Sequence, residues 1–422
     1  MIDPASHKTT PGDDESQLQD PVSLSDEDIW KAFRHHSPGV VTFPSVLAQI
    51  PIQRTLNPTV PEPPDGRFRF EYAEHTWLGN AIPLRWHDGT TKLAKEILIS
   101  LPNGLRITYG TINALAGDFY AMSDPICEGP SLMQRQDRFR RSFDFLASDP
   151  KTPAEAQELM HLLQLEIDRV NEALRQGKSV PEAYYSLGDM TAEFLTIMSK
   201  YRPIGSGKPD YLRLAKSNLD HFGEGARMAY DAGHSLALEV AAKGTPQALE
   251  LGYAMNAFAD HFLEDQFAAG HLRTPRKALS GIGVSDLCSK YMHDEDNAIG
   301  LQVSNPHGET WTAYGDKKLL TGDDAENQKR CHQALMASAD EVYDAWTSRK
   351  PTPIGLFKAW NHAPTLQSAQ AKQEHEPLFN PKAQVRTPFE DRRSTNYTSV
   401  FNWVGLYMKF RESPVFKEPI RL

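Results

Sequence analysis

The chain has 422 residues, of which 40% are hydrophobic and 24% are charged, values typical of a folded globular protein rather than a disordered one. Its 45 basic and 55 acidic residues give a net charge of -10, which argues against binding of duplex nucleic acid, because that binding needs a basic face. The sequence has 15 histidines but only three cysteines, without the spacing of a disulfide scaffold. We therefore expect any bound metal to be held by imidazole and carboxylate groups.

Residues 1–66 are polar, acidic and interrupted by prolines, which predicts an extended segment. They contain neither the basic region nor the apolar stretch of a secretory signal peptide. We therefore expect a protein that is cytoplasmic, one that is secreted by a non-classical route, or the mature form of a secreted protein. No apolar run approaches the length of a membrane-spanning helix, so we expect no transmembrane segment.

Short mixed segments between 67 and about 118 predict helices with one or two strands. Thr245 and Pro246 have the N-cap and N1 arrangement that opens a helix, and Gly244 suits the C-cap of the helix before it. His234 lies midway along an Ala/Leu-rich segment and is predicted to be a core residue. Apolar periodicity and the cap signals predict helices over about 153–176, 223–244, 245–270 and 324–346.

These patterns predict a mostly α fold with extended N- and C-terminal segments. We expect three parts along the chain. They are the extended segment 1–66, a helical catalytic domain over 67–350 with an insertion at about 120–215, and a C-terminal appendage or small lobe over 351–422.

The most informative stretch is DHFLEDQFAAGH, residues 260–271. His261 and Asp265 are four residues apart, so they share one face of the predicted helix and can bind one cation together. Gly270 can end the helix and turn His271 back towards the same place. An ordinary surface pair would show the same spacing, so further residues must support the site.

Several other histidines and carboxylates could complete a metal site. Imidazole and carboxylate ligands without cysteine suit Zn²⁺ in an open, catalytic arrangement. One candidate heads a helix, two others stand beside small or aromatic residues, and the rest belong to the acidic run MHDEDN. They are His75, Asp118, His221, His293, Asp296 and Asn297.

The order and spacing of these residues resemble the zinc-dependent phospholipase C superfamily, which also contains zinc-dependent single-strand nucleases. The match rests on His261-x3-Asp265-x5-His271, with His221-Phe222 about forty residues upstream. It is most similar to the bacterial phosphatidylcholine-hydrolysing phospholipase C group of Pseudomonas and Legionella. The resemblance implies an all-helical bundle that binds two or three Zn²⁺ ions per chain.

Ligand roles follow from the resemblance alone. It implies that His221, His261 and Asp118 hold one zinc ion, and that Asp265 bridges to a second ion served by His75. His271 and His293 would hold the remaining ion. The family has an acidic ligand four residues after the later histidine, where this chain has Asn297, so either Asp296 or the Asn297 carbonyl oxygen would take that place. Asp189 and Asp210 are rivals for the role of Asp118.

The implied activity is hydrolysis of the glycerol-phosphate ester of phosphatidylcholine-like phospholipids to diacylglycerol and a phosphorylated head group. A metal-bound hydroxide would attack phosphorus, with Asp118 orienting it or accepting its proton. Phe119 and Tyr120 are candidates for contact with a quaternary ammonium head group, or else residues of the core. A phospholipid substrate is compatible with peripheral membrane contact.

Two alternatives remain at the level of sequence. The same metal site would serve a zinc-dependent single-strand nuclease or phosphomonoesterase. The second alternative is a non-catalytic helical protein with a degenerate metal site that binds a lipid or a partner.

Overall fold

A computed structural model describes residues 71–177, 190–280, 285–315, 318, 324–389 and 391–399. Within these ranges the protein is mostly helical, as the sequence predicts, with twelve α-helices and eight short strands. The strands pair only as two-stranded antiparallel hairpins. The predicted extended segment 1–66 lies outside the described residues, and the division into three parts stays a prediction.

The centre of the bundle is the antiparallel pair α9 (Gly223–Ala241) and α10 (Pro246–Glu264). The Thr245 side chain accepts a hydrogen bond from the Ala248 amide and Pro246 follows at N1, which confirms the predicted start of α10. Gly244, with a φ of 72°, makes the turn between the two helices. Every residue from Gly252 to Glu264 is buried, so α10 runs through the core.

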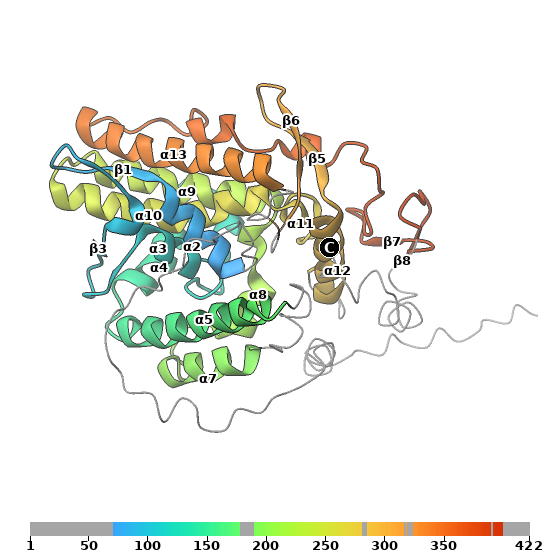
Figure 1. Ribbon diagram of the computed structural model, residues 1–422, viewed down its shortest axis with the longest axis horizontal. Coiled ribbons are helices and arrows are strands. Elements are labelled where there is room, and N and C mark those ends of the chain that lie inside the picture. The colour runs from blue at the N-terminus through green and yellow to red at the C-terminus, as the bar shows by residue number, and fades with distance from the viewer. Residues whose placement is uncertain are drawn as a thin grey trace, which may run out of the picture.

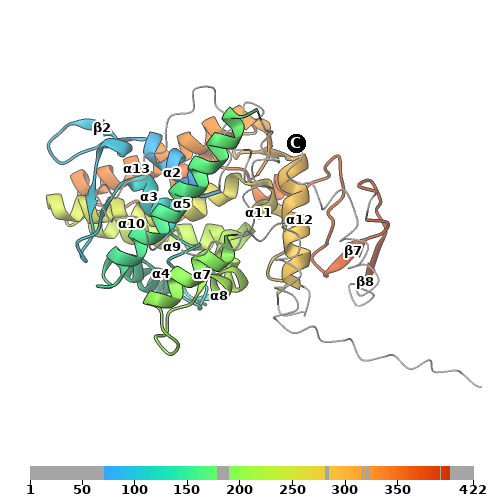
Figure 2. The same ribbon diagram turned by 60° about the horizontal axis from the view of Figure 1, so that its bottom comes forward.

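The other helices pack around this pair (Figures 1 and 2). Helix α13 lies along one side of α9 and α10, while α3 packs on α10 and α4 on α9. Helices α5 and α7 lie side by side in an outer layer, within the predicted insertion. The bounds are α2 (Glu71–Ala81), α3 (Tyr109–Leu115), α4 (Leu132–Ala147), α5 (Thr152–Arg175), α7 (Thr191–Tyr201), α8 (Tyr211–Ser217) and α13 (Ala325–Ser348).

Helix α12 (Ser285–Ile299) stands across one end of the bundle, next to the short helix α11 (Ala269–Arg273). In both views α12 lies between the bundle and the C-terminal hairpin (Figures 1 and 2). That hairpin belongs to the segment after α14 (Leu366–Ala369). The hairpins are β1 (Pro83–Arg85) with β2 (Thr91–Leu93), β3 (Ile99–Ser100) with β4 (Arg106–Ile107), β5 (Leu301–Ser304) with β6 (Thr310–Ala313), and β7 (Gln384–Arg386) with β8 (Tyr397–Ser399).

The helix predicted over 245–270 ends earlier than expected. Helix α10 stops at Glu264, and the chain continues as a 3-10 turn over Asp265–Phe267. Ala268 then takes an extended conformation, with φ of -94° and ψ of 120°, which separates this turn from α11. The break places His271 on a helix of its own.

A close crossing of α2 and α3 brings two distant segments together near the centre of the protein. A Cβ atom on Gly110 would lie 2.2 Å from the Thr76 carbonyl oxygen, so only glycine allows this approach. The crossing places His75 of α2 close to the chain that leaves α3.

A buried polar network joins α3, α9, α10 and α13 in the core. Asp260 accepts hydrogen bonds from the Tyr109 hydroxyl at 2.6 Å and from Ser338 Oγ at 2.7 Å. Asn256 Nδ2 donates to the Tyr109 hydroxyl oxygen at 2.7 Å and to Ser338 Oγ at 2.9 Å, and Asn256 Oδ1 lies 2.5 Å from Nδ1 of His234. His234 is fully buried, which confirms it as a core residue.

Among the described residues, no helix combines the length and the apolar character that crossing a membrane requires.

Candidate metal centre

Six of the residues predicted from the sequence converge at one place in the bundle. They come from α2, from the loop after α3, from the 3-10 turn before α9, from α10, from the 3-10 turn that follows it, and from α11. In chain order they are His75, Asp118, His221, His261, Asp265 and His271.

One group of potential ligands is fully buried. It consists of His221, His261 and Asp265, whose ligand atoms lie within 4.8 Å of one another. Nδ1 of His221 is 3.2 Å from Nε2 of His261 and 3.0 Å from Oδ2 of Asp265. His221 is placed by its neighbour Asp220, whose carboxylate accepts the amide hydrogens of Ile126 and Cys127.

A second group shares His261 with the first. The ligand atoms of His75, Asp118 and His261 also lie within 4.8 Å of one another. The rings of His75 and His261 stack with centroids 4.3 Å apart. Asp118 is partly exposed, so this group faces the more open side of the centre.

Hydrogen bonds behind the rings fix which nitrogen faces the centre. Nδ1 of His75 donates to Glu264 Oε2 at 2.6 Å, and Nδ1 of His261 donates to the Asn113 carbonyl oxygen at 3.1 Å. The Asn113 side chain in turn donates to Glu264 Oε1 at 2.7 Å. Both histidines therefore keep Nε2 for the centre, in the arrangement by which metal-binding histidines are usually oriented.

The sequence interpretation missed these supporting groups. Glu264 had a visible signal, because it follows His261 by three residues on one helix, among apolar neighbours. The Asn113 carbonyl had none, since any residue supplies a backbone oxygen.

Gly117 allows His221 and His261 to lie close to the loop after α3, because it has no side chain. Its φ of 62° is a conformation that favours glycine. A Cβ atom at this position would lie 2.6 Å from both His221 Cε1 and His261 Nε2. The loop that carries Asp118 can therefore approach both rings.

The buried charges compensate one another. Burial opposes ionisation of Asp265, but the surrounding histidines hold the pKa of this carboxyl well below its usual range. Although burial acts against a charged His221, the charge of Asp265 raises its pKa to about 9. Burial and the neighbouring His75 hold the pKa of His261 well below its usual range, so His261 is a neutral imidazole, the form that binds metal ions.

His271 reaches the same centre from α11, and His293 stands beside it. Nδ1 of His271 lies 2.8 Å from Asp265 Oδ1, and the rings of His271 and His293 are 4.9 Å apart between centroids. The two nitrogens of His293 contact Asp294 Oδ1 at 3.0 Å and Asn297 Nδ2 at 3.1 Å. Asn297 Oδ1 accepts the Gly270 amide hydrogen at 2.6 Å, so Asn297 is occupied in holding α11.

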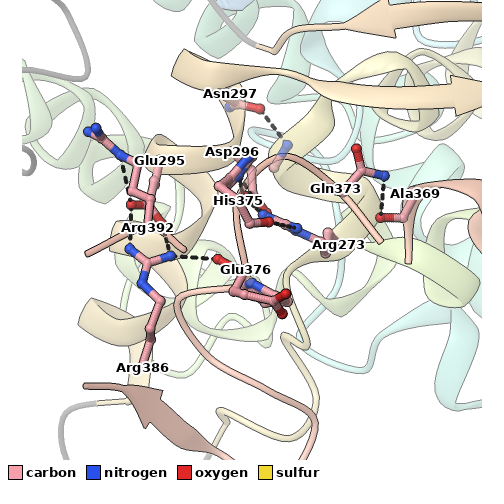
Figure 3. Close-up of polar contacts among 12 residues, drawn as sticks. Arg273, Glu295, Asp296, Asn297, Ala369, Gln373, His375, Glu376, Arg386 and Arg392 are labelled. Atoms are coloured by element: carbon pink, nitrogen blue, oxygen red, sulfur yellow. Dashed lines mark hydrogen bonds and ion pairs between the residues drawn. The ribbon is translucent and has the colours of Figure 1, made fainter. Parts of the chain in front are cut away.

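The structure does not bring Asp296 to the centre. Its carboxylate is fully buried against the guanidinium of Arg273 and lies near His375 (Figure 3). The family resemblance suggested Asp296 as a metal ligand. Its two partners come from distant segments, which a local pattern cannot reveal.

Phe119 and Tyr120 lie in the hydrophobic core, the second of the two alternatives considered for them. Phe119 packs on Phe194 with ring centroids 5.2 Å apart, and Tyr120 packs on Phe145 at the same distance. Of the rivals for Asp118, Asp210 caps α8 by accepting the amide hydrogen of Arg213, and Asp189 lies outside the described residues.

The residues present fit a metal ion. Oδ2 of Asp265 is buried, and no donor among the described residues meets it with hydrogen-bond geometry, although His221 Nδ1 is close. A cation at this oxygen would satisfy it, and Nε2 of the neutral His261 imidazole lies 3.9 Å away. Both groups around His261 could therefore hold a metal ion. A small cavity lined partly by His75, Glu264 and Asp265 adjoins them.

No protein-family model, curated protein or solved structure matches this chain.

Proposed function

We propose that this protein is a zinc-dependent phosphodiesterase of the phospholipase C type. It would hydrolyse the glycerol-phosphate ester of phosphatidylcholine-like phospholipids to diacylglycerol and a phosphorylated head group. The observation that carries the proposal is the meeting of two groups of nitrogen and oxygen ligands at His261. The resemblance of the His261-x3-Asp265-x5-His271 pattern to that superfamily supports zinc as the metal and a phospholipid as the substrate.

Each of the two groups would bind one zinc ion. His221, His261 and Asp265 would hold one zinc ion, and His75 with Asp118 would bind a second beside it. His271 is close enough to Asp265 to contribute as well. Bound zinc ions neutralise phosphate oxygens and increase the acidity of water.

The remaining chemistry belongs to side chains of this protein. Asp118 is the partly exposed carboxylate of the centre, so it is placed to orient the attacking water and to accept its proton. Glu264 holds the His75 ring by its hydrogen bond to Nδ1. Because His75 and Glu264 sit on packed helices, they keep their geometry while the substrate enters and leaves.

Substrate assays decide between a lipid and a nucleic acid. We expect the purified full chain to release the phosphorylated head group from phosphatidylcholine micelles. A chelator should stop this release and added Zn²⁺ should restore it. Cleavage of single-stranded DNA or of a simple phosphomonoester, with the lipid untouched, would reject the lipid assignment. A protein that retains no zinc after mild purification would contradict the metal centre itself.

Variants of His261 and Asp265 test whether these residues act as metal ligands. His261→Ala and Asp265→Asn should each reduce hydrolysis to background, because each removes a ligand from the buried group. The packed core should preserve the helix content in far-UV circular dichroism. His87→Ala, an exposed histidine between β1 and β2, is the matched control and should keep full activity. Full activity in either ligand variant would refute the site.

A further inference from the structure

We propose that Arg273 and Asp296 are positioning residues of the metal centre. Together with His375 of the C-terminal segment, they fix α11 and thereby hold His271 beside Asp265. This inference rests on the proposed metal centre, and it assigns a role to a segment that follows Arg273 by 102 residues.

Helix α11 needs support from outside because it is only five residues long. Isolated helices of this length do not persist in water. Two contacts hold its first turn, since the Ala269 amide donates to the Tyr314 carbonyl oxygen at 2.9 Å and the Gly270 amide donates to Asn297 Oδ1 at 2.6 Å. At its other end, the buried Leu272 packs into the hydrophobic core, and the Arg273 side chain provides buried polar contacts to other elements.

Arg273 is bound on two sides by buried groups (Figure 3). Its guanidinium meets the Asp296 carboxylate through two nitrogens, with Nε to Oδ2 at 2.9 Å, and its Nη1 donates to the His375 carbonyl oxygen at 3.2 Å. The side chains of Arg273 and Asp296 are 4% and 0% exposed. A bidentate pair with so little water around it holds one orientation and not a range of them.

His375 completes this cluster from the C-terminal segment. Its Nε2 lies 2.6 Å from Arg273 Nη2 and 3.0 Å from Asp296 Oδ1. A single ring nitrogen can accept from the arginine or donate to the carboxylate, so either tautomer of His375 supports the pair.

The neighbouring residue Glu295 provides an internal comparison. It binds Arg386 through both carboxylate oxygens, at 2.8 and 3.2 Å, and it also contacts Arg392 at 3.4 Å (Figure 3). Glu295 therefore fastens the C-terminal segment to α12 through its bonds to Arg386 and Arg392, whereas Asp296 bonds both Arg273 of α11 and His375 of the C-terminal segment. Loss of Asp296 should release α11, whereas loss of Glu295 should loosen the chain around Arg386 and leave the Arg273–Asp296 pair in place.

The link to the metal is short. Arg273 follows His271 by two residues on the same turn, and Nδ1 of His271 lies 2.8 Å from Asp265 Oδ1. When the Arg273 end of α11 moves, His271 moves away from Asp265 with it. The expected result is weaker zinc binding without any change in a ligand.

The test compares Asp296→Asn and His375→Gln with Glu295→Gln in the full chain. Amide hydrogen exchange of residues 269–273 is measured in chelator-treated protein, and zinc affinity is measured by competition with a chromophoric chelator. Asp296→Asn should accelerate exchange in α11 and weaken zinc binding by roughly 10-fold or more, the usual loss for a group that supports a ligand. His375→Gln should change both in the same direction by less. Glu295→Gln should accelerate exchange near Arg386 and leave α11 and zinc affinity unchanged.

Two results would overturn the inference. One is wild-type exchange in α11 together with wild-type zinc affinity in Asp296→Asn, and the other is an equal loss in Glu295→Gln. If Asp296→Asn fails to fold, His375→Gln, which keeps the ion pair, decides by the same two measurements. A wild-type chain that binds no zinc would reject the proposed function, and hydrogen exchange would then decide whether Asp296 holds α11.

Discussion

The packing of the two central histidines depends on the absence of a Cβ atom at Gly117. It combines a left-handed backbone with a position where any Cβ atom would collide with two imidazole rings. Gly308, in the turn between β5 and β6, has a similar φ of 78° but nothing within 4 Å of its hypothetical Cβ. Comparing substitutions at these two glycines therefore distinguishes the cost of a left-handed backbone, which both share, from the cost of a collision, which only Gly117 has.

We predict that Gly308→Ala lowers the free energy of unfolding by about 1–2 kcal/mol, because alanine is strained in this conformation, and that Gly117→Ala lowers it further, because its Cβ also collides with two imidazole rings. Gly117→Ala should lose zinc binding as well, since its Cβ displaces His221 or His261. Chemical unfolding and zinc titration of both variants check this. Zinc affinity that falls equally in both, or in neither, would contradict it.

At the level of single residues, the sequence was informative where ligands are close in the chain. His261 lies in the last turn of α10 and Asp265 directly follows this helix, so their spacing of four residues already indicates a common face. Asp296 was assigned to the centre as a substitute for the family's acidic ligand, and its actual partners Arg273 and His375 are distant in sequence. A local pattern indicates that an acidic side chain is present but not which cation it meets.

At the level of elements, Arg202 connects the inserted helices to the loop that carries Asp118. Its Nε donates to Glu155 of α5 at 2.6 Å, and its Nη2 donates to the Phe119 carbonyl oxygen at 2.9 Å. Both side chains of this ion pair are 1% exposed. Burial raises the pKa of Glu155 even though Arg202 opposes this, so the carboxylate depends on its partner.

We therefore predict that Arg202→Met lowers the free energy of unfolding by about 3–5 kcal/mol, because it leaves the Glu155 carboxylate buried without a counter-charge. The double variant Arg202→Met with Glu155→Leu should regain much of this loss. Guanidinium unfolding of the single and double variants measures both. A double variant as unstable as Arg202→Met alone would show that the buried charge is not the cause.

Most of the helices could be predicted from the sequence. Their ends could be predicted only where the capping residues are neighbours in the sequence. The Thr245 and Pro246 signal gave the start of α10 correctly. Its end at Glu264 was missed, because the turn after it depends on Asp265 being buried among histidines from other segments. The mixed segments before residue 118 form hairpins of two or three residues per strand, too short for a periodicity to appear.

At the level of the whole molecule, the centre ties together segments from α2 to α11 that are otherwise joined through the apolar core. A ligand that binds only the folded state stabilises it by about 4 kcal/mol at a concentration 1,000 times its Kd. The apolar core between α9 and α10 is built from residues that are not the proposed metal ligands. The helices should therefore persist without the ion.

We predict that a chelator lowers the Tm of the wild-type protein by several degrees and leaves its far-UV circular dichroism at 25 °C unchanged. Thermal unfolding with and without excess zinc gives the size of the effect. His261→Ala, which lacks the residue common to both groups, should show a much smaller response to the chelator. An equal response in this variant would place the stabilising ion elsewhere.

The polar network around Asp260 has a consequence for how the bundle is aligned. Apolar contacts between helices are interchangeable and tolerate sliding, whereas hydrogen bonds pair particular atoms. If α13 slipped by one turn, about 5.4 Å, Ser338 would leave Asp260 and Asn256. Each buried group left unpaired would cost about 1–3 kcal/mol. This network therefore sets a single register for the helices, and an arriving ion meets a preformed site that it does not have to assemble.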